Sequence, residues 1–357
     1  MLAVFLFFSC QTTNIISKGI HPVETKVFST ESQILPKRII FDTKYYQENN
    51  AVFFIASNYT QDYSKLIEYN LKSDKIDKVI FDEESTIICD YDSNQSMIVF
   101  TAVNSNSEEA IYYYNITSKV LEKYNGVLPK SENGYYPNHV SVGVNWLCWI
   151  EHDFEERISK IKALNLNDKT TKIICEKPFI EDRIRVPYIF IDMQDDYLAY
   201  DERNSDGSVL LYILDLNGVE PTIKLEAMKD VVLHYNGSYN PENNYLALYA
   251  LTNKNDLIYR IDITNNKATK LAGFYEHAVL YDDIIETNNN QILYTIQKNV
   301  SGEIKDHYYA EIYNLDNYTM SSEMGCLHIV KNEMYTGLLR FDEIEDIQKI
   351  HFELYQN

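Results

Sequence analysis

The sequence predicts an all-β fold made from one repeated unit, and three observations support this prediction. Short segments alternate apolar and polar residues, as half-buried strands do, and residues 257–263 (LIYRIDI) are an example. Residues 264–267 (TNNK) interrupt that run before residues 268–271 resume it, which is typical of a β-hairpin with a short turn containing Asn. Amphipathic helical patterning of any length is absent.

The same hairpin recurs along the chain with different letters, for example as IYYYNITSKVLEKY and IKALNLNDKTTKII. Its first strand ends at an Asn, an Asp or, in a weaker last copy (KIHFELYQN), a Glu. These anchor residues lie 39 to 52 positions apart: Asn70, Asn115, Asn165, Asp215, Asp262, Asn314 and Glu353. A period of about 40 to 50 residues that holds four strands is typical of a β-propeller blade.

Two further apolar runs precede the hairpins, as a four-stranded blade requires. NHVSVGV and WLCWIEH precede Asn165, VVLHYNG and NYLALYAL precede Asp262, and HAVLYDDIIE and QILYTIQ precede Asn314. Each repeat is therefore expected to contribute four consecutive antiparallel strands.

The number of blades depends on the two ends of the chain. After the sixth hairpin come three expected strands, CLHIVKN, EMYTGLLRF and IQKIHFELY, and no fourth. At the other end, residues 23–32 (VETKVFSTES) are a strand left over before the first blade. If that strand completes the last blade, no sheet edge is left open where the ring closes. We therefore predict one domain over residues 23–357, a seven-bladed β-propeller closed by its N-terminal strand; the alternative is six blades.

Charge excludes one class of partner. The chain has 32 Lys and Arg against 53 Asp and Glu, a net charge of -21. Such a surface repels phosphate backbones, so we expect no nucleic-acid partner, and the simplest role of the charge is solubility. A Gly-x-Ser-x-Gly nucleophile elbow is also absent from the sequence.

The first residues resemble the end of a bacterial lipoprotein signal. Residues 1–9 (MLAVFLFFS) are apolar and are followed by Cys10 and a polar stretch, QTTN. The match departs from the usual pattern because a basic first region is missing and Phe8 is bulky; the alternative is a buried first strand. The resemblance implies that residues 1–9 are a signal-peptide remnant, Cys10 carries the lipid and residues 10–22 are a linker. The protein would then lie in the bacterial cell envelope, outside the cytoplasm, and touch the membrane only through its lipid.

The other cysteines do not form a recognisable metal or redox motif. Cys89, Cys148, Cys175 and Cys326 fall in different expected strands, without a Cys-x-x-Cys pair. We expect them to be buried as small apolar residues. A disulfide between Cys148 and Cys175, both in the third blade, is an open alternative in an oxidising compartment.

Several blades resemble the repeat of TolB-like propellers. In residues 238–272 (SYNPENNYLALYALTNKNDLIYRIDITNNKATKLA) a Pro-containing turn precedes an apolar strand, and Ile-Tyr-x-x-Asp precedes a Lys-x-x-x-Leu strand. Residues 201–225 are similar, with Asp206-Gly207 in the loop. The match departs at Glu242-Asn243, where the family has Asp-Gly. The resemblance implies a binding or scaffolding role at the cell envelope, and it implies no catalytic residue.

Two long connections between blades are candidate binding loops because binding residues concentrate on loops of a rigid scaffold. They are residues 124–138 and 176–187, and both are expected on the same face of the ring. Aromatic and Arg side chains dominate recognition sites. The candidates are Tyr135, Tyr136, Phe179, Arg183 and Arg185. The alternatives are that Tyr is simply abundant, with 30 in the chain, and that the arginines balance Glu181 and Asp182.

Four histidines fall at or near the starts of expected innermost strands of different blades: His139, His234, His277 and His328. If their rings converge on the channel mouth, they could hold a divalent metal, as in propeller lyases that act on acidic sugars. The alternative is that each ring packs between blades. The acidic segments 152–157 and 201–207 are expected to be solvated loops on the same face.

These observations favour a non-catalytic envelope protein whose propeller binds a protein or a glycan. A carbohydrate-active enzyme, a lyase or hydrolase with its site at the channel mouth, is the alternative from another class, and a pure spacer is a third. Metal retained through purification would favour the enzyme; otherwise no cofactor is expected.

Overall fold

The computed structural model describes the backbone of most residues between 24 and 356 and the side chains of most residues between 51 and 269. The described ranges are residues 24–29, 38–46, 51–58, 63–70, 72–73, 75–129, 139–180, 186–206, 208–218, 223–226, 231–240, 243–252, 256–270, 278–279, 285–288, 291–298, 308–314, 320–324, 326–331, 335–344 and 347–356. Every regular element within these ranges is a strand, which confirms the all-β prediction.

The strands of the described residues form seven antiparallel sheets. The first sheet contains β2 (Arg38–Tyr46), β3 (Ala51–Asn58), β4 (Ser64–Asn70) and β5 (Lys75–Phe81). The second contains β6 (Thr86–Ser93), β7 (Met97–Asn104), β8 (Glu109–Asn115) and β9 (Val120–Lys123). The third contains β10 (Val140–Val142), β11 (Trp146–Asp153), β12 (Ile158–Asn165) and β13 (Thr171–Pro178). The fourth contains β14 (Ile191–Gln194), β15 (Tyr197–Arg203), β16 (Val209–Asp215) and β17 (Ile223–Glu226). The fifth contains β18 (Val231–Asn240), β19 (Tyr245–Thr252), β20 (Asp256–Asp262) and β21 (Lys267–Lys270).

The last two sheets are less regular. The sixth contains β22 (Ala278–Val279), β23 (Ile285–Asn288), β24 (Gln291–Lys298), β25 (Tyr308–Asn314) and β26 (Met320–Met324). Here the single strand expected over HAVLYDDIIE is divided into β22 and β23, and both pair with β24. The seventh sheet contains β27 (Cys326–Lys331), β28 (Tyr335–Ile344), β29 (Ile347–Gln356) and, from the other end of the chain, β1 (Glu24–Ser29). β1 lies antiparallel to β29, from Glu24 opposite Leu354 to Ser29 opposite Lys349.

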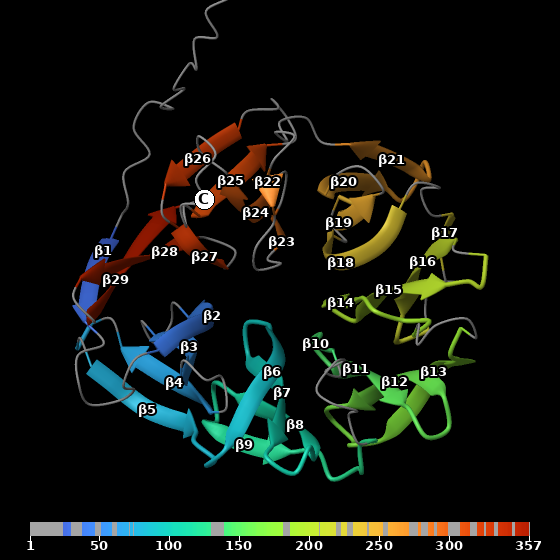
Figure 1. Ribbon diagram of the computed structural model, residues 1–357, viewed down its shortest axis with the longest axis horizontal. Coiled ribbons are helices and arrows are strands. Elements are labelled where there is room, and N and C mark those ends of the chain that lie inside the picture. The colour runs from blue at the N-terminus through green and yellow to red at the C-terminus, as the bar shows by residue number, and fades with distance from the viewer. Residues whose placement is uncertain are drawn as a thin grey trace, which may run out of the picture.

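The sheets lie side by side around a common centre (Figure 1). The first strand of each of the first five sheets faces that centre, and the fourth strand lies on the outside. Successive sheets contact one another, and β2 of the first sheet also contacts β27 of the seventh. This is the arrangement of a β-propeller.

The hydrophobic core lies between sheets because each sheet buries one face against its neighbour. One cluster joins the first and second sheets through Phe53, Leu66 and Phe100. A second joins the second and third sheets through Val99 and Trp149. Two similar clusters join the third sheet to the fourth and the fourth to the fifth. The alternation that predicted strands follows from this layering: in β16 every second residue is buried.

The predicted anchor residues end the third strand of each of the first six sheets, and their chemistry explains the turn that follows. The Asn70 and Asn165 side-chain oxygens accept backbone N–H groups two and three residues further on, at 2.9 to 3.2 Å, as Asx turns do. The hairpin then needs one residue with positive φ. That residue is Lys119 (56°), Lys169 (60°), Gly218 (73°) or Asn266 (48°).

No helix long and apolar enough to span a membrane occurs among the described residues.

Candidate functional site

The connections of the ring fall on two faces, because successive strands of each sheet run in opposite directions. The tight turns after the first and third strands lie on one side, which we call the turn face. The connections from second to third strands, and from each sheet to the next, lie on the other side, which we call the loop face. The two long connections predicted to bind a partner are both on the loop face.

His139 stands where the first of these connections enters the third sheet. Its backbone oxygen accepts the N–H of Ile150 at 2.9 Å, which fixes it immediately ahead of β10. Its Nδ1 lies 3.4 Å from Oδ2 of Asp90 on β6, and the two side chains are 37% and 25% exposed. The same carboxylate oxygen accepts the N–H of Val140 at 2.8 Å. The His139 imidazole is thus accessible to solvent and positioned by a neighbouring sheet.

A buried aromatic cluster lies beside it; it consists of His152, Phe154, Ser159 and Phe179, and we call it the His152 cluster. The His152 ring centroid is 6.4 Å from those of Phe154 and Phe179, which are themselves 5.3 Å apart. His152 Nδ1 is 2.8 Å from Ser159 Oγ. Burial, reinforced by His139, lowers the pKa of His152 to about 3, so its ring is neutral at physiological pH.

The His152–Ser159 contact does not have the properties of a nucleophile and its base. Ser159 is fully buried, so a substrate does not reach its oxygen in this conformation. An imidazole with a pKa near 3 is also far from the range in which a general base works well. The Asp201 carboxylate nearby accepts the N–H groups of Ile189 and Phe190 through Oδ1. The cluster is therefore a packed support beneath the loop face.

The second long connection is held at both ends by backbone bonds. Phe179 N donates to the Arg157 oxygen at 2.8 Å, and Arg203 N donates to the Pro187 oxygen at 2.8 Å. Phe179, predicted to contact a ligand, is only 5% exposed and packs on His152. The Phe179 ring therefore packs under the start of the second long connection and does not face solvent. Tyr135, Tyr136, Arg183 and Arg185 lie outside the described residues, as does the lipidation candidate Cys10, and for them the predictions stay predictions.

The four candidate metal ligands are described to different extents. Both the backbone and the side chain of His139 are described. The backbones of His234 and His328 lie on the first strands β18 and β27, as predicted. The side chains of those two, and all of His277, lie outside the described residues. Within the described part of the chain, no group of three or more His, Cys, Asp or Glu side chains is placed to hold a metal ion. The metal site stays a prediction.

The cysteines differ from one another more than expected. Cys148 on β11 and Cys175 on β13 flank β12, opposite Ala163 and Ile161 respectively, and both are free thiols. Burial raises the pKa of Cys175 to about 11. The expectation of burial is wrong for Cys89, which is exposed. Its exposure has a local cause, because the pairing of β6 with β7 skips this residue.

The acidic segments were expected to be solvated loops on the loop face, and this is only partly right: residues 152–153 belong to β11 and residues 201–203 to β15, and both His152 and Asp201 are buried. Residues 154–157 join β11 to β12, and residues 204–208 join β15 to β16. Asp153 Oδ1 accepts the N–H groups of Glu155 and Glu156 at 3.1 and 2.9 Å, so the first loop is folded on its own carboxylate. Glu155 and Glu156 are exposed.

No protein-family model matches the sequence. No curated protein matches it either. Solved structures do match. The β-propeller domain of the Trilobed protease from Pyrococcus furiosus, described as having an open velcro topology, aligns with a TM-score of 0.61 at 10% identity and covers 91% of this chain and 96% of that one. A prolyl endopeptidase aligns with a TM-score of 0.57 at 9% identity, over 90% of this chain but 50% of the other. A chain of the mitotic checkpoint complex aligns with a TM-score of 0.54 at 11% identity, over 99% of both.

These likenesses establish the fold class: the chain is a β-propeller. It spans about half the length of the prolyl endopeptidase it matches. At identities of 9 to 11% they say nothing of activity. TolB from Acinetobacter baumannii aligns with a TM-score of 0.47 at 9% identity, over 93% of this chain and 81% of that one. That likeness is too weak to carry an argument, so the TolB-like character of the repeat motif stays a prediction.

Proposed function

We propose that this chain is a non-catalytic β-propeller of the bacterial cell envelope that binds a protein or a glycan through its loop face. The observation that carries the proposal is the convergence of the two long connections. One connection enters the third sheet at His139, and the other leaves it at Phe179. Both ends lie beside the His152 cluster, because Phe179 packs on His152 and His139 helps to lower the pKa of His152. Loops anchored on a packed support are where propellers and other rigid scaffolds place binding residues.

The scaffold is, on this proposal, a seven-bladed ring closed by its own N-terminal strand. Support comes from the seven sheets, from the contact between β2 and β27, and from the antiparallel pairing of β1 with β29. Closure in this way ties the two ends of the chain together and leaves no unpaired strand between the first and last sheets. It differs from the open topology described for the Pyrococcus furiosus domain.

Attachment to the membrane is, on the same proposal, by a lipid on Cys10. Its support is the apolar stretch 1–9 followed by a cysteine and a polar segment. A Cys10→Ser variant should lose incorporation of radiolabelled palmitate and move from the membrane to the soluble fraction. Equal labelling of the variant and the original chain would contradict the anchor while leaving the binding proposal intact.

The enzymatic alternative keeps one specific support, namely that His139 comes directly before the first strand of its sheet and that His234 and His328 lie on first strands. It requires a divalent metal that stays with the protein during purification. Elemental analysis of the purified chain, with a His139→Ala, His234→Ala, His328→Ala variant as the control, decides between the two readings. About one metal ion per chain that the variant loses would favour the enzyme.

Binding is tested by capture of envelope components on the immobilised full chain after chemical cross-linking. Replacing Tyr135, Tyr136, Arg183 and Arg185 by Ala should lower the amount captured by about tenfold, because such residues dominate recognition energy. The matched control replaces Lys72 and Lys267, which are exposed on the turn face, by Ala. Equal loss in both variants, or no loss in the loop variant, would refute the proposal.

A further inference from the structure

Exposed lysines on the turn face follow the repeat. In four of the first five sheets, the connection from the third to the fourth strand carries an exposed lysine in the turn or at the start of the fourth strand. The third and fourth strands are the outer ones, so these lysines lie toward the outer edge of the ring (Figure 1). We call them the lysine rim: Lys72, Lys75, Lys119, Lys169, Lys172 and Lys267. Asp195 is an exposed acid of the same face, but it lies in a turn between first and second strands and so nearer the centre.

Three members of the lysine rim carry charges that no acid of the protein neutralises locally. Within the described part of the chain, Lys72, Lys75 and Lys267 have no ion-pair partner. Two exposed acids near the rim are bonded to neighbouring groups. Asp77 accepts an amide N–H from the adjacent strand at 3.0 Å, and Asp168 accepts an N–H and a hydroxyl of its own turn at 2.9 and 2.6 Å. Lysine also carries its charge at the end of a long stem, so the outermost charges of this edge are cationic.

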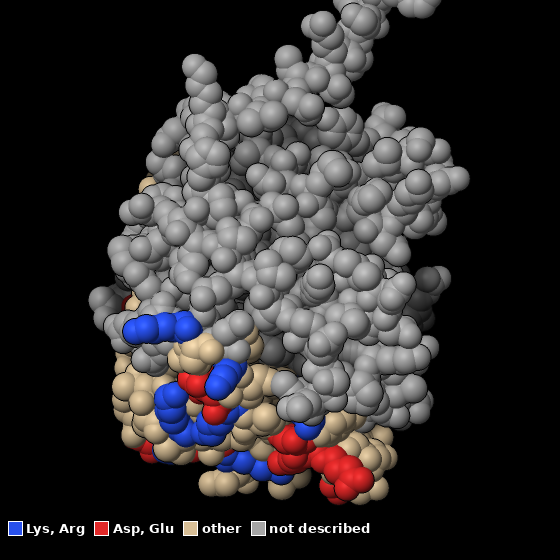
Figure 2. All heavy atoms as spheres, turned by 90° about the vertical axis from the view of Figure 1, so that its left-hand side faces the viewer, with Lys and Arg blue, Asp and Glu red and all other residues tan. Residues whose placement is uncertain are grey.

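The loop face has the opposite character. Residues 82–84 (DEE) are exposed between β5 and β6, and Glu155 and Glu156 are exposed between β11 and β12. Figure 2 views the ring edge-on and shows Lys and Arg gathered toward the left of the described surface and Asp and Glu toward the lower right. The faces lie about one strand length apart, roughly 23 Å for the seven residues of β4. That exceeds twice the Debye length of about 8 Å at physiological salt, so a surface that meets the turn face is screened from the loop-face acids.

The chain also enters the ring on the turn face. β1 begins at Glu24, which lies opposite Leu354 near the end of β29. β29 is the third strand of its sheet, and third strands end on the turn face. The segment that contains Cys10 is therefore joined to the turn-face edge of the seventh sheet. That sheet contacts the first sheet, which carries Lys72 and Lys75.

We propose that the lysine rim docks on an anionic lipid membrane, so that the turn face lies against the membrane and the loop face points away from it. The proposal rests on the envelope anchor proposed above. Residues between Cys10 and Glu24 span at most about 50 Å when fully extended, so the tether alone allows either face to reach the membrane. Charge selects the turn face, because anionic headgroups attract nearby lysines and repel the acids of the loop face.

A membrane fits this surface better than a single anionic molecule does. The lysine rim is spread over four sheets, so a flat surface meets several lysines at once, whereas one carboxylate or phosphate group meets one. The tethered segment also brings this face, and not the loop face, next to the lipid. The lipid on Cys10 is then one of two membrane contacts and not the only one, as was expected from the sequence.

Energy transfer from the protein to labelled vesicles measures which face lies nearer the membrane. The full chain with Cys10→Ser and Cys89→Ser is held by an N-terminal hexahistidine tag on phosphatidylglycerol vesicles that contain nickel-chelating lipid and an acceptor dye. A donor dye is attached at Val144→Cys on the turn face or at Val127→Cys on the loop face, where the valines are 60% and 93% exposed. After subtraction of the signal from the chain without a new cysteine, transfer should be about twofold or more greater from position 144, because the positions lie about one strand length apart. Equal transfer, or greater transfer from position 127, overturns the proposal.

Vesicle charge separates the effect of the lysines from that of the tether. The original chain should show more transfer from position 144 on phosphatidylglycerol than on phosphatidylcholine, and about 1 M salt should remove that difference. Lys72→Gln, Lys75→Gln, Lys267→Gln should also remove it, because each lysine near an anionic surface strengthens binding by about fivefold. Circular dichroism checks the fold, and the salt series on the original chain decides if that variant does not fold. The matched control loses the same charge at the loop-face end of the third sheet and should behave as the original chain: Arg157→Gln, Lys160→Gln, Lys177→Gln.

The outcomes separate this proposal from the one it rests on. A preference for phosphatidylglycerol that the lysine variant loses and the control keeps supports membrane docking. Equal transfer on both kinds of vesicle overturns it, since the tether alone then sets the orientation. Retention of the original chain, but not of the lysine variant, on an immobilised anionic polysaccharide, without any preference among vesicles, assigns the lysine rim to a polymer and also overturns it. If palmitate labelling of Cys10 fails while the preference for phosphatidylglycerol holds, the anchor is wrong and the lysine rim stands.

Discussion

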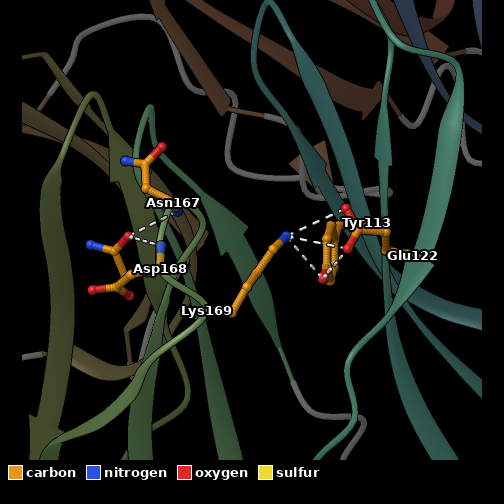
Figure 3. Close-up of polar contacts among 6 residues, drawn as sticks. Tyr113, Glu122, Asn167, Asp168 and Lys169 are labelled. Carbon is orange, nitrogen blue, oxygen red and sulfur yellow. Dashed lines mark hydrogen bonds and ion pairs between the residues drawn. The ribbon is translucent and has the colours of Figure 1, made fainter.

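The turn face and the loop face of this ring are held together differently. On the turn face, side chains of one sheet bond to the next: Asn145 donates from its backbone and its amide to the Asp196 carboxylate at 2.8 and 2.7 Å. Lysines reach back to the preceding sheet, and Figure 3 shows Lys169 pointing at Tyr113 and Glu122. On the loop face, side chains also join sheets, as Asp90 does with His139, but the long connections are held at their ends by backbone bonds and rest on the His152 cluster. Such a division leaves the loops free to vary while the ring keeps its geometry.

The exposed charged side chains also differ between the turn face and the loop face. Exposed charges on described loop-face connections are mainly acidic, for example Glu84, Glu108 and Glu155, whereas the described turns carry lysines such as Lys72 and Lys119. In Figure 2, blue gathers toward the left of the described surface and red toward the lower right. A cationic ligand should therefore approach the two faces at different rates, and the difference should shrink as salt is added.

The largest effect is expected at Gly143 on the turn face. A Cβ at this position would lie 1.7 Å from the Asp195 backbone oxygen of the next sheet. Gly143→Ala must push the third and fourth sheets apart, and we expect a loss of about 3 kcal/mol or more in the free energy of unfolding. Urea denaturation measures it. Gly218→Ala, at φ 73° with no atom within 4 Å, is the control and should cost about 1 kcal/mol.

Lys119 and Lys169 occupy equivalent turn positions but should not be equivalent in energy. Lys119 Nζ lies 2.8 Å from Oε1 of Glu68, whose side chain is only 1% exposed. Lys119→Met leaves that buried carboxylate without its cation, so we expect a loss of about 2 to 3 kcal/mol. Adding Glu68→Gln to the same chain should recover part of the loss, and a double-mutant cycle in urea measures the coupling. Purely additive losses would show that the pair does not interact across the sheets.

The His152 cluster predicts a pH dependence on the loop face. The pKa of His152 is lowered to about 3 in the folded chain, so below its unfolded value of about 6.5 the unfolded state binds a proton that the folded state does not. Above about pH 6.5 the burial of His152 should therefore not lower the free energy of unfolding, and as pH falls from there toward 3 it should lower it progressively. Between pH 7 and pH 5.5 the loss in the free energy of unfolding should be about 1.3 kcal/mol smaller in His152→Gln than in the original chain. Identical slopes of stability against pH would contradict the burial of this ring.

The smallest effect is expected at Lys169. Its Nζ lies 3.3 Å from Glu122 Oε2 and 4.6 Å from the Tyr113 ring centroid, and the side chains of Lys169 and Glu122 are 47% and 46% exposed. Solvent screens such a pair, so Lys169→Met should cost about 0.5 kcal/mol at low salt and less at 1 M salt. A loss as large as that of Lys119→Met would show that burial of the acidic partner does not set the strength of these contacts.

Much of the ring could be predicted from local patterns, because strands and Asx turns are coded by neighbouring residues. Asn115 and Asn165 end third strands as the anchor spacing predicted, and Glu24–Ser29, within the strand predicted at residues 23–32, pair with β29. The lysine contacts could not be predicted, since Glu68 and Glu122 are 51 and 47 residues away from their partners and only the packing of sheets brings them together. One sequence feature does mark these lysines. Lys119 and Lys169 occupy a turn position that Gly218 and Asn266 fill in the next two repeats.

The site was predicted less well, for a physical reason. Sequence alternation says which residues face a sheet's neighbour, but a single skipped residue in the pairing reverses that assignment. This is why Cys89 is exposed although we expected it to be buried as a small apolar residue. Phe179 does belong to a long connection, but it is buried at the base of that connection and was predicted to contact a ligand. An aromatic residue at the base of a loop and one at its tip look the same in sequence.

The most direct test of the ring is a cross-link between its two ends. Val27 of β1 lies opposite His351 of β29, and directly opposed residues of antiparallel strands are close enough for a disulfide. The Val27→Cys, His351→Cys chain should form an intrachain bond under mild oxidation, seen as a reducible shift in mobility on a denaturing gel that the original chain lacks. A variant that forms only bonds between chains, or none, would contradict a propeller closed by its N-terminal strand.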